Sequence, residues 1–174
     1  VAHAASPEGM KRAINAGVST IEHGDNGTPE VFKLMKEKNV ALCPTLAAGD
    51  AIEQYRGWKK GTDPEPERIT NKKKSFQQAL DAGVTICMGG DVGVYTHGDN
   101  AREMELMVEY GMKPLEVLKS STSVNADVFG YAGKIKRIKK GLFADIIAVE
   151  GDPSADIKNI RKLKLVMKNG VIYK

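Results

Sequence analysis

The stretch Val18-Ser19-Thr20-Ile21-Glu22-His23 decides the fold, because it is an apolar-rich strand pattern that ends in an imidazole. Two other stretches have the same form. Val1-Ala2-His3 ends in a second histidine, and Val84-Thr85-Ile86-Cys87-Met88-Gly89-Gly90-Asp91 ends in an aspartate. In a fold of parallel strands, functional side chains gather where the strands end. Two imidazoles and a carboxylate there are the ligands that a hydrolytic metal site requires. The sequence therefore predicts a metal site with three ligands: His3, His23 and Asp91.

Helix signals alternate with these strands. Ser6-Pro7-Glu8 and Thr28-Pro29-Glu30 each predict the start of a helix, because Ser or Thr caps the first turn and Pro suits its first position. Residues 40–45 form another strand pattern, and residues 69–82 form a helix with an apolar face before the strand at residues 84–88. Strands that alternate with helices predict a parallel α/β fold.

The number of strands limits the architecture. A closed (β/α)8 barrel of the TIM type needs about 250 residues. This chain has 174 residues and four strand patterns before its β-rich tail. The sequence therefore predicts the second half of such a barrel. A doubly wound sheet is the alternative, but the chain has no G-x-G-x-x-G phosphate loop to support it.

The last part of the chain changes character. Residues 145–149, 163–167 and 171–173 are short strand patterns, and Asn169-Gly170 is a strong signal for a two-residue hairpin turn. We therefore expect two regions. Residues 1–130 would form half of a (β/α)8 barrel, and residues 131–174 would form a small β-rich tail.

The first strand pattern is short. Only two residues precede His3, whereas a strand has about five or six residues. The chain also lacks an initiator Met. We therefore expect it to be part of a larger protein, which leaves open whether a signal peptide once preceded it.

Composition and charge limit the kinds of partner and the cellular location that we expect. The net charge is +4, and basic residues cluster in the last third, but no aromatic residues interleave with them, so we expect no nucleic-acid partner. No window approaches the roughly 18 apolar residues of a membrane span. Cys43 and Cys87 lie in separate strand patterns without a CxxC motif. We expect two buried thiols in a reducing compartment, and hence a cytoplasmic location.

These motifs resemble the amidohydrolase superfamily, in particular its imidazolonepropionase-related and Xaa-Pro dipeptidase-like members. Val1-Ala2-His3-Ala4, Ile21-Glu22-His23-Gly24 and Gly89-Gly90-Asp91-Val92-Gly93 resemble the ends of the fifth, sixth and eighth barrel strands. Residues 133–135, 140–145 and 151–153 resemble the return of the chain into a small β-sandwich. The resemblance covers essentially the whole chain, as the carboxyl-terminal half of such an enzyme.

The chain also departs from the family pattern. Family members often have Thr at the position of Gly90, and close relatives often read His-Ala-His where this chain reads His3-Ala4-Ala5. The family's H-x-H pair on strand one, and its carboxylated Lys or Glu on strand four, would lie in the missing half.

The resemblance implies a hydrolase of carbon–nitrogen bonds, similar to imidazolonepropionase or prolidase, that uses one or two divalent ions such as zinc. A bound metal lowers the pKa of water towards about 7. Asp91 would take the proton of that water and pass it to the leaving nitrogen. Dipeptides, N-acyl amino acids and cyclic amides are the expected substrates.

For other polar and aromatic residues, the sequence allows both a functional and a structural role. His97, six residues after Asp91, would polarise the substrate carbonyl or bind its carboxylate, or would simply face solvent as a loop histidine. Arg102 opens the next helix, and we expect an exposed arginine there rather than a carboxylate clamp. Tyr55 and Trp58, in a polar insertion over residues 47–67, would line the site or pack as a short lid helix.

Two other functions compete with hydrolysis. The chain on its own would be an inactive half-barrel that associates with its missing half or with a second copy, because unpaired edge strands favour such pairing. The remaining alternative is a basic binding module, which the missing aromatic pattern disfavours.

Overall fold

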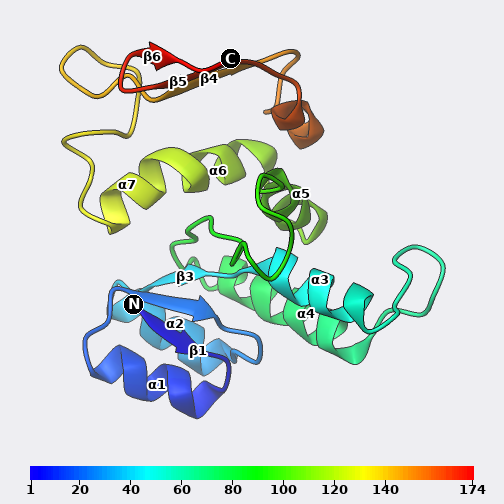
Figure 1. The fold of residues 1–174 in the computed structure, drawn as a ribbon. Helices are drawn as coiled ribbons and strands as arrows, with labels where there is room; N and C mark the ends of the chain where they lie inside the picture. Colours follow the sequence, from blue (N-terminus) through cyan, green and yellow to red (C-terminus); the bar gives the residue numbers. More distant parts are fainter.

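The structure is a computed structural model that describes all residues, 1–174. Its amino-terminal part is built on a parallel three-stranded sheet in the order β1-β2-β3 (Figure 1). The strands are β1 Ala2–Ala4, β2 Thr20–His23 and β3 Ala41–Cys43. The register pairs Ala4 with His23 and Glu22 with Cys43. The predicted α/β class, with parallel strands, is confirmed.

Seven α-helices accompany the two sheets. They are α1 Pro7–Asn15, α2 Pro29–Glu37, α3 Leu46–Tyr55, α4 Glu67–Asp81, α5 Ala101–Glu109, α6 Pro114–Lys119 and α7 Asn125–Val128. A π-helical turn, Ser120–Val124, joins α6 to α7. Ser6 caps α1 as predicted, because its hydroxyl accepts a hydrogen bond from the Gly9 amide at 3.2 Å.

The predicted fourth strand, residues 84–88, is reduced to one parallel bridge between Leu42 and Ile86. The Leu42 amide donates to the Thr85 carbonyl at 2.9 Å, and the Cys87 amide donates to the Leu42 carbonyl at 2.8 Å. The ladder stops there because the side chain of Asn125, on α7, bonds both the amide and the carbonyl of Met88. The segment nevertheless lies beside β3.

The two faces of the sheet differ in chemistry. One face packs on helices through a buried core that includes Ile21, Leu42 and Phe32. Side chains alternate along a strand, and paired residues share a face. The register His3–Glu22–Cys43 therefore sets an imidazole, a carboxylate and a thiol in a row on the other face.

The polar insertion is more ordered than its composition predicts. The short helix expected to carry Tyr55 and Trp58 begins at Leu46, as α3, and it ends at Tyr55, before Trp58. Its first two amides are bonded by the distant carboxylate of Glu103. This start depends on a contact that local sequence signals do not contain.

The carboxyl-terminal part holds a second, antiparallel sheet in the order β4-β5-β6, with a 3-10 helix at Ile157–Arg161. Its strands are β4 Ile146–Val149, β5 Leu163–Lys168 and β6 Val171–Ile172. Asn169 and Gly170 both have positive φ, which is the conformation of the predicted hairpin turn. Helices α5, α6 and α7 lie between the two sheets (Figure 1). No helix has the length and apolar character needed to cross a bilayer.

Candidate active site at the strand ends

The parallel pairing of β1 and β2 brings two of the predicted ligands together. The imidazole rings of His3 and His23 have centroids 4.3 Å apart, with their planes at 68°. The backbone turns sharply at His23, which has a φ of 76°. Backbone strain of this kind is costly for a residue with a side chain and is concentrated at functional sites. The two rings therefore form the centre of the candidate site.

The ring of His23 is held from one side by β3. Its Nδ1 lies 2.6 Å from Oγ1 of Thr45, just after the end of that strand. Burial lowers the pKa of His23, and the positive charge of Lys72 lowers it further. In the tautomer whose Nδ1–H donates to the Thr45 hydroxyl, the neutral imidazole keeps a lone pair on Nε2. This is the form that binds metal ions.

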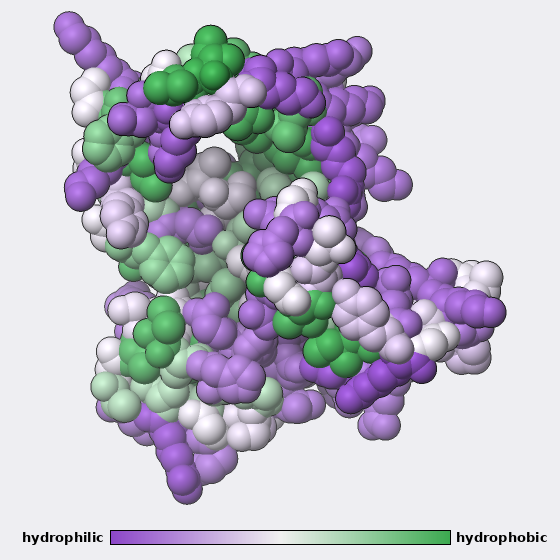
Figure 2. All heavy atoms as spheres, viewed as in Figure 1, coloured by the Kyte–Doolittle hydropathy of each residue, from purple (hydrophilic) through white to green (hydrophobic).

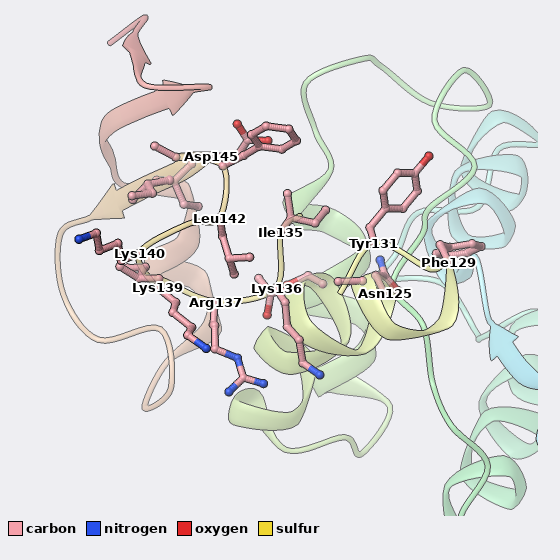
Figure 3. Close-up of a pocket in the computed structure, with 18 residues that line it drawn as sticks. Asn125, Phe129, Tyr131, Ile135, Lys136, Arg137, Lys139, Lys140, Leu142 and Asp145 are labelled. Carbon is pink, nitrogen blue, oxygen red and sulfur yellow. The ribbon is translucent and has the colours of Figure 1, made fainter. Parts of the chain in front are cut away.

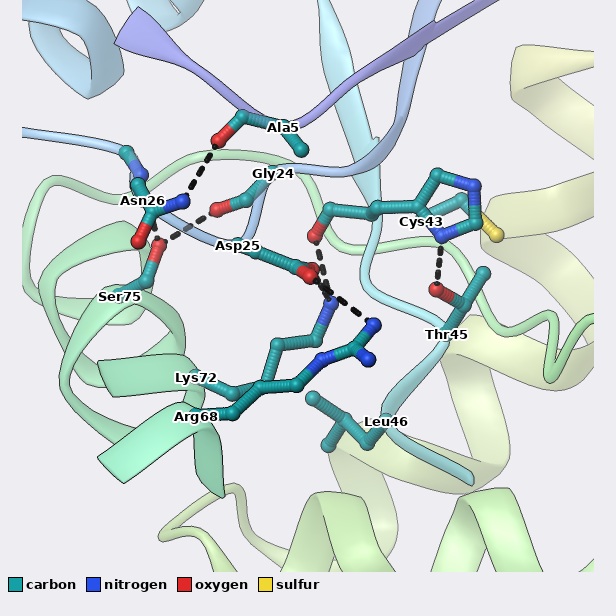
Figure 4. Close-up of polar contacts among 12 residues, drawn as sticks. Ala5, Gly24, Asp25, Asn26, Cys43, Thr45, Leu46, Arg68, Lys72 and Ser75 are labelled. Carbon is teal, nitrogen blue, oxygen red and sulfur yellow. Dashed lines mark hydrogen bonds and ion pairs between the residues drawn. The ribbon is translucent and has the colours of Figure 1, made fainter. Parts of the chain in front are cut away.

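The backbone of His23 is held from the opposite side by α4. Lys72, only 4% exposed, donates from Nζ to the His23 carbonyl at 3.0 Å. The same ammonium forms an ion pair with Asp25, whose other oxygen lies 3.8 Å from Arg68 (Figure 4). Burial lowers the pKa of Lys72, while the Asp25 carboxylate opposes that shift. A buried ion pair thus fixes the turn that follows β2.

Asp91 and His97 lie on the loop between residues 89 and 100, and both are exposed. Asp91 has a φ of 58°, and its charge raises the pKa of His23 slightly. No three His, Cys, Asp or Glu side chains anywhere in the chain are grouped tightly enough to hold a metal ion. The structure therefore places His3 beside His23, but it does not bring Asp91 into the same ligand cluster.

The donor set nevertheless suits a divalent ion. Two imidazoles from neighbouring strands lie in contact, and the Nδ1 of His23 is hydrogen-bonded to Thr45. Nitrogen ligands of this kind bind zinc, and a hydrogen bond at the other ring nitrogen is the usual support. Two of the donors are in place, and the carboxylate of Asp91 is the remaining candidate.

The loop that carries Asp91 is packed against two large side chains. A Cβ at Gly90 would lie 2.0 Å from Oη of Tyr95 and 3.3 Å from Cβ of Glu103. Tyr95 is 4% exposed, and burial raises its pKa to about 12. The tyrosine thus takes the space that the family's threonine side chain would need at this position.

The two cysteines are buried free thiols, as predicted. Burial raises the pKa of Cys43, and a hydrogen bond with Glu22 raises it further. Burial raises the pKa of Cys87 to about 12. Both groups are therefore protonated at neutral pH and are poor metal ligands in this state.

The structure also shows the surroundings of Arg102, Tyr55 and Trp58. Arg102 pairs with the buried carboxylate of Asp50 and covers the ring of Tyr95 at 5.6 Å. It therefore serves a packed ion pair and is not free to bind a substrate carboxylate. Tyr55 is 70% exposed at the end of α3, and Trp58 packs against the core.

Sequence reasoning missed Thr45, Lys72 and Glu103 as parts of the site. Lys72 falls in line with the buried Ile69, Phe76 and Ala79 on the apolar face of α4. Glu103 falls in the same way among the buried methionines of α5. A charged residue within an apolar helix stripe was the signal that could have identified both.

A cavity of about 870 Å³ lies elsewhere, between α7 and the segment that leads into β4 (Figure 3). The molecule is visibly hollowed between the carboxyl-terminal sheet and the helices below it (Figure 2). The cavity is lined by apolar side chains such as Phe129, Ile138 and Phe143, with lysines at its edge. Neither His3 nor His23 borders it. We place the candidate active site at the strand ends, because the imidazoles of His3 and His23 lie there.

The amidohydrolase family matches residues 1–173. The chain belongs to this family of hydrolases that act on carbon–nitrogen bonds. The predicted membership is confirmed.

The chain is similar in sequence and structure to three known hydrolases. Ochratoxinase from Aspergillus niger is 33% identical over 99% of the chain, and its crystal structure superposes with a TM-score of 0.82 over 99% of the chain at 30% identity. A Xaa-Pro dipeptidase with bound methionine in its active site is 35% identical over 99% of the chain, with a TM-score of 0.87. A prolidase complexed with N-methylphosphonate-L-proline is 26% identical, with a TM-score of 0.82 over 99% of the chain.

The chain spans only part of each relative. It covers 37% of the ochratoxinase sequence, and 44% of both the dipeptidase and the prolidase chains.

Proposed function

We propose that the protein containing this chain is a metal-dependent amidohydrolase that cleaves an amide C–N bond of a small substrate. The contact between the rings of His3 and His23 carries this proposal. Two imidazoles at the carboxyl ends of adjacent parallel strands have the position and chemistry of a catalytic zinc site. Membership of the amidohydrolase family supports the same reaction.

Each residue has a proposed role. His3 and His23 would hold a divalent ion, with Asp91 as a further ligand. The bound ion would supply a polarised carbonyl and an acidified water. Asp91 accepts the proton of the attacking water and returns it to the leaving nitrogen. His97, on the same exposed loop, binds the carbonyl or the carboxylate of the substrate.

Dipeptides are the first substrate class to examine, because a Xaa-Pro dipeptidase and a prolidase are among the relatives. N-acyl amino acids and cyclic amides follow. These substrates share a small size and one amide bond, which a single site of this kind can cleave. Because both cysteines are free thiols, we propose that the protein works in a reducing compartment, the cytoplasm.

We also propose that residues 1–130 are half of a (β/α)8 barrel and that residues 131–174 are part of a small β-sandwich domain. In the first sheet, β1 pairs only with β2, so its outer edge is free. In the tail, Ile138, Phe143 and Ile172 are at least half exposed. A free edge and exposed apolar side chains favour association with the rest of the protein or with a second copy. The chain alone would then be inactive.

Elemental analysis tests the proposal. The chain is purified without added metal, beside a His23→Ala variant and a His97→Ala control. About one zinc per chain, lost only in the His23→Ala variant, would support the site, and hydrolysis of a dipeptide panel by the full-length protein would then be measured. Folded chain without zinc, even after incubation with excess zinc, would contradict a metal site in this chain alone. The full-length protein would then be measured in the same way.

A further inference from the structure

Thr45 occupies an unusual place at the start of α3. Threonine is a favoured N-cap residue, and its hydroxyl normally accepts a hydrogen bond from an amide in the first helical turn. Here Thr45 is the N-cap of α3, but it has a left-handed φ of 49° and caps nothing with its side chain. Its hydroxyl instead meets Nδ1 of His23 at 2.6 Å.

The amides that Thr45 leaves uncapped are taken by a distant carboxylate. Glu103, on α5, accepts hydrogen bonds from the Leu46 amide at 2.9 Å and from the Ala47 amide at 2.6 Å. Glu103 is fully buried, and so is Leu46 at 1% exposure. Each of its two oxygens bonds one amide, so the carboxylate fixes both the position and the direction of the first turn of α3.

We propose that Glu103 is a positioning residue for His23: by capping α3 it holds Thr45 in the conformation that bonds the imidazole. This inference deepens the proposed function and depends on it for its catalytic meaning. A helix cap alone does not explain the arrangement, because a threonine already stands at the N-cap and could serve. Burying a carboxylate to do that work is expensive. Because the Glu103 carboxylate caps the helix, the hydroxyl of Thr45 is available to bond His23.

We therefore expect the position of the His23 ring to depend on Thr45, and the position of Thr45 to depend on Glu103. Removing the Thr45 hydroxyl breaks the contact to His23 directly. Replacing Glu103 by Gln turns one accepting oxygen into a donating amide, which cannot bond the Leu46 or Ala47 amide that faces it. The start of α3 then shifts, and the contact between Thr45 and His23 loosens. Both changes free the imidazole to rotate.

Nitrogen-15 NMR of the histidine rings in the metal-free 174-residue chain tests this dependence. We compare the wild type with Thr45→Val, Glu103→Gln and the double variant, at one pH above 7, where the Glu103 carboxylate is ionised and both of its oxygens accept. Each single variant should shift the Nδ1 resonance of His23 and weaken zinc binding by about 10-fold, as loss of a supporting hydrogen bond does. In the Thr45→Val background, Glu103→Gln should add nothing further to either quantity.

Ser120→Ala is the matched control, because Ser120 is equally buried and its hydroxyl bonds the Ile86 carbonyl at 2.7 Å, next to β3. It should leave the His23 resonance in place. If Glu103→Gln does not fold, Glu103→Asp, whose shorter side chain cannot reach both amides, replaces it. Equal effects of the Glu103 change with and without the Thr45 hydroxyl would overturn the proposal. Because the ring resonance needs no metal, it would still report positioning if zinc did not bind and the proposed function failed.

Discussion

The imidazole of His3 meets the imidazole of His23 edge to face, with 4.3 Å between ring centroids. The two residues are separated by a complete helix, α1, and they meet because β1 and β2 are parallel neighbours whose carboxyl ends coincide. An aromatic pair of this geometry is weakly favourable in itself. The more important consequence is that two nitrogen donors lie next to each other at the carboxyl ends of β1 and β2.

We predict that His3→Ala and His23→Ala weaken zinc binding by similar factors, of at least about 100-fold, because each removes one of two adjacent donors. Isothermal titration of the metal-free chain measures both affinities. His97→Ala serves as the control and should bind zinc as the wild type does. A His3→Ala variant with unchanged affinity would exclude His3 from the ligand set.

We predict that Glu103 makes folding stability decrease between about pH 5 and pH 7. Burial raises its pKa from an ordinary 4.5 to about 7, although the two amide bonds oppose the shift. The folded chain therefore holds the proton over a range in which the unfolded chain has lost it. The stabilisation is complete below the unfolded pKa and is lost as pH rises through the folded pKa.

The full shift corresponds to about 3 kcal/mol, of which about 2 kcal/mol is lost between pH 5 and pH 7 and the rest outside that range. Urea unfolding at pH 5, 6 and 7 measures it, with the wild type compared to Glu103→Gln. The variant cannot titrate at this position, so its stability should decrease less over the same range. Parallel stability curves for the two proteins would show that Glu103 is not the group responsible.

We predict that Gly90→Ala destabilises the fold by about 2 kcal/mol, because the new methyl group would overlap the hydroxyl of buried Tyr95. The cost should fall below about 1 kcal/mol in a Tyr95→Phe background, where the nearest ring carbon is 3.1 Å away. Thermal and urea unfolding measure this coupling. Gly49→Ala is the control, since no atom lies within 4 Å of the added methyl group. An equal cost of Gly90→Ala in both backgrounds would assign the effect to the backbone.

We predict that Lys72→Met destabilises the fold by about 3 kcal/mol, because it leaves the Asp25 carboxylate without its buried ammonium partner. The His23 carbonyl would also lose its donor. Lys74→Met, two residues further along the same helix at an exposed position, should change stability by less than about 0.5 kcal/mol. Chemical unfolding of the two variants makes the comparison, and a similar loss in both would remove the special role of Lys72.

The periodicity of the sequence was enough to predict that the rings of His3 and His23 are neighbours. Strand patterns that end in His3 and His23, one helix apart, imply neighbouring parallel strands and therefore neighbouring rings. The sequence pattern could not predict the residues that hold His23 in place. Glu103 reaches Leu46 across 57 positions, and Lys72 reaches His23 across 49. Contacts at this separation depend on how the helices pack on the sheet, which local patterns do not specify.

The sequence by itself determined the parallel strands, the capped start of α1, the Asn169-Gly170 hairpin and the family. The first three follow from local conformational preference or from the alternation of apolar residues, and the family follows from the resemblance of the motifs around His3, His23 and Asp91. Tertiary structure alone decided that the segment after α4 forms one bridge rather than a strand, because Asn125 occupies the backbone of Met88. It also decided where α3 begins and which hydroxyl holds His23. Those outcomes depend on buried polar groups, which must find partners wherever the packed chain supplies them.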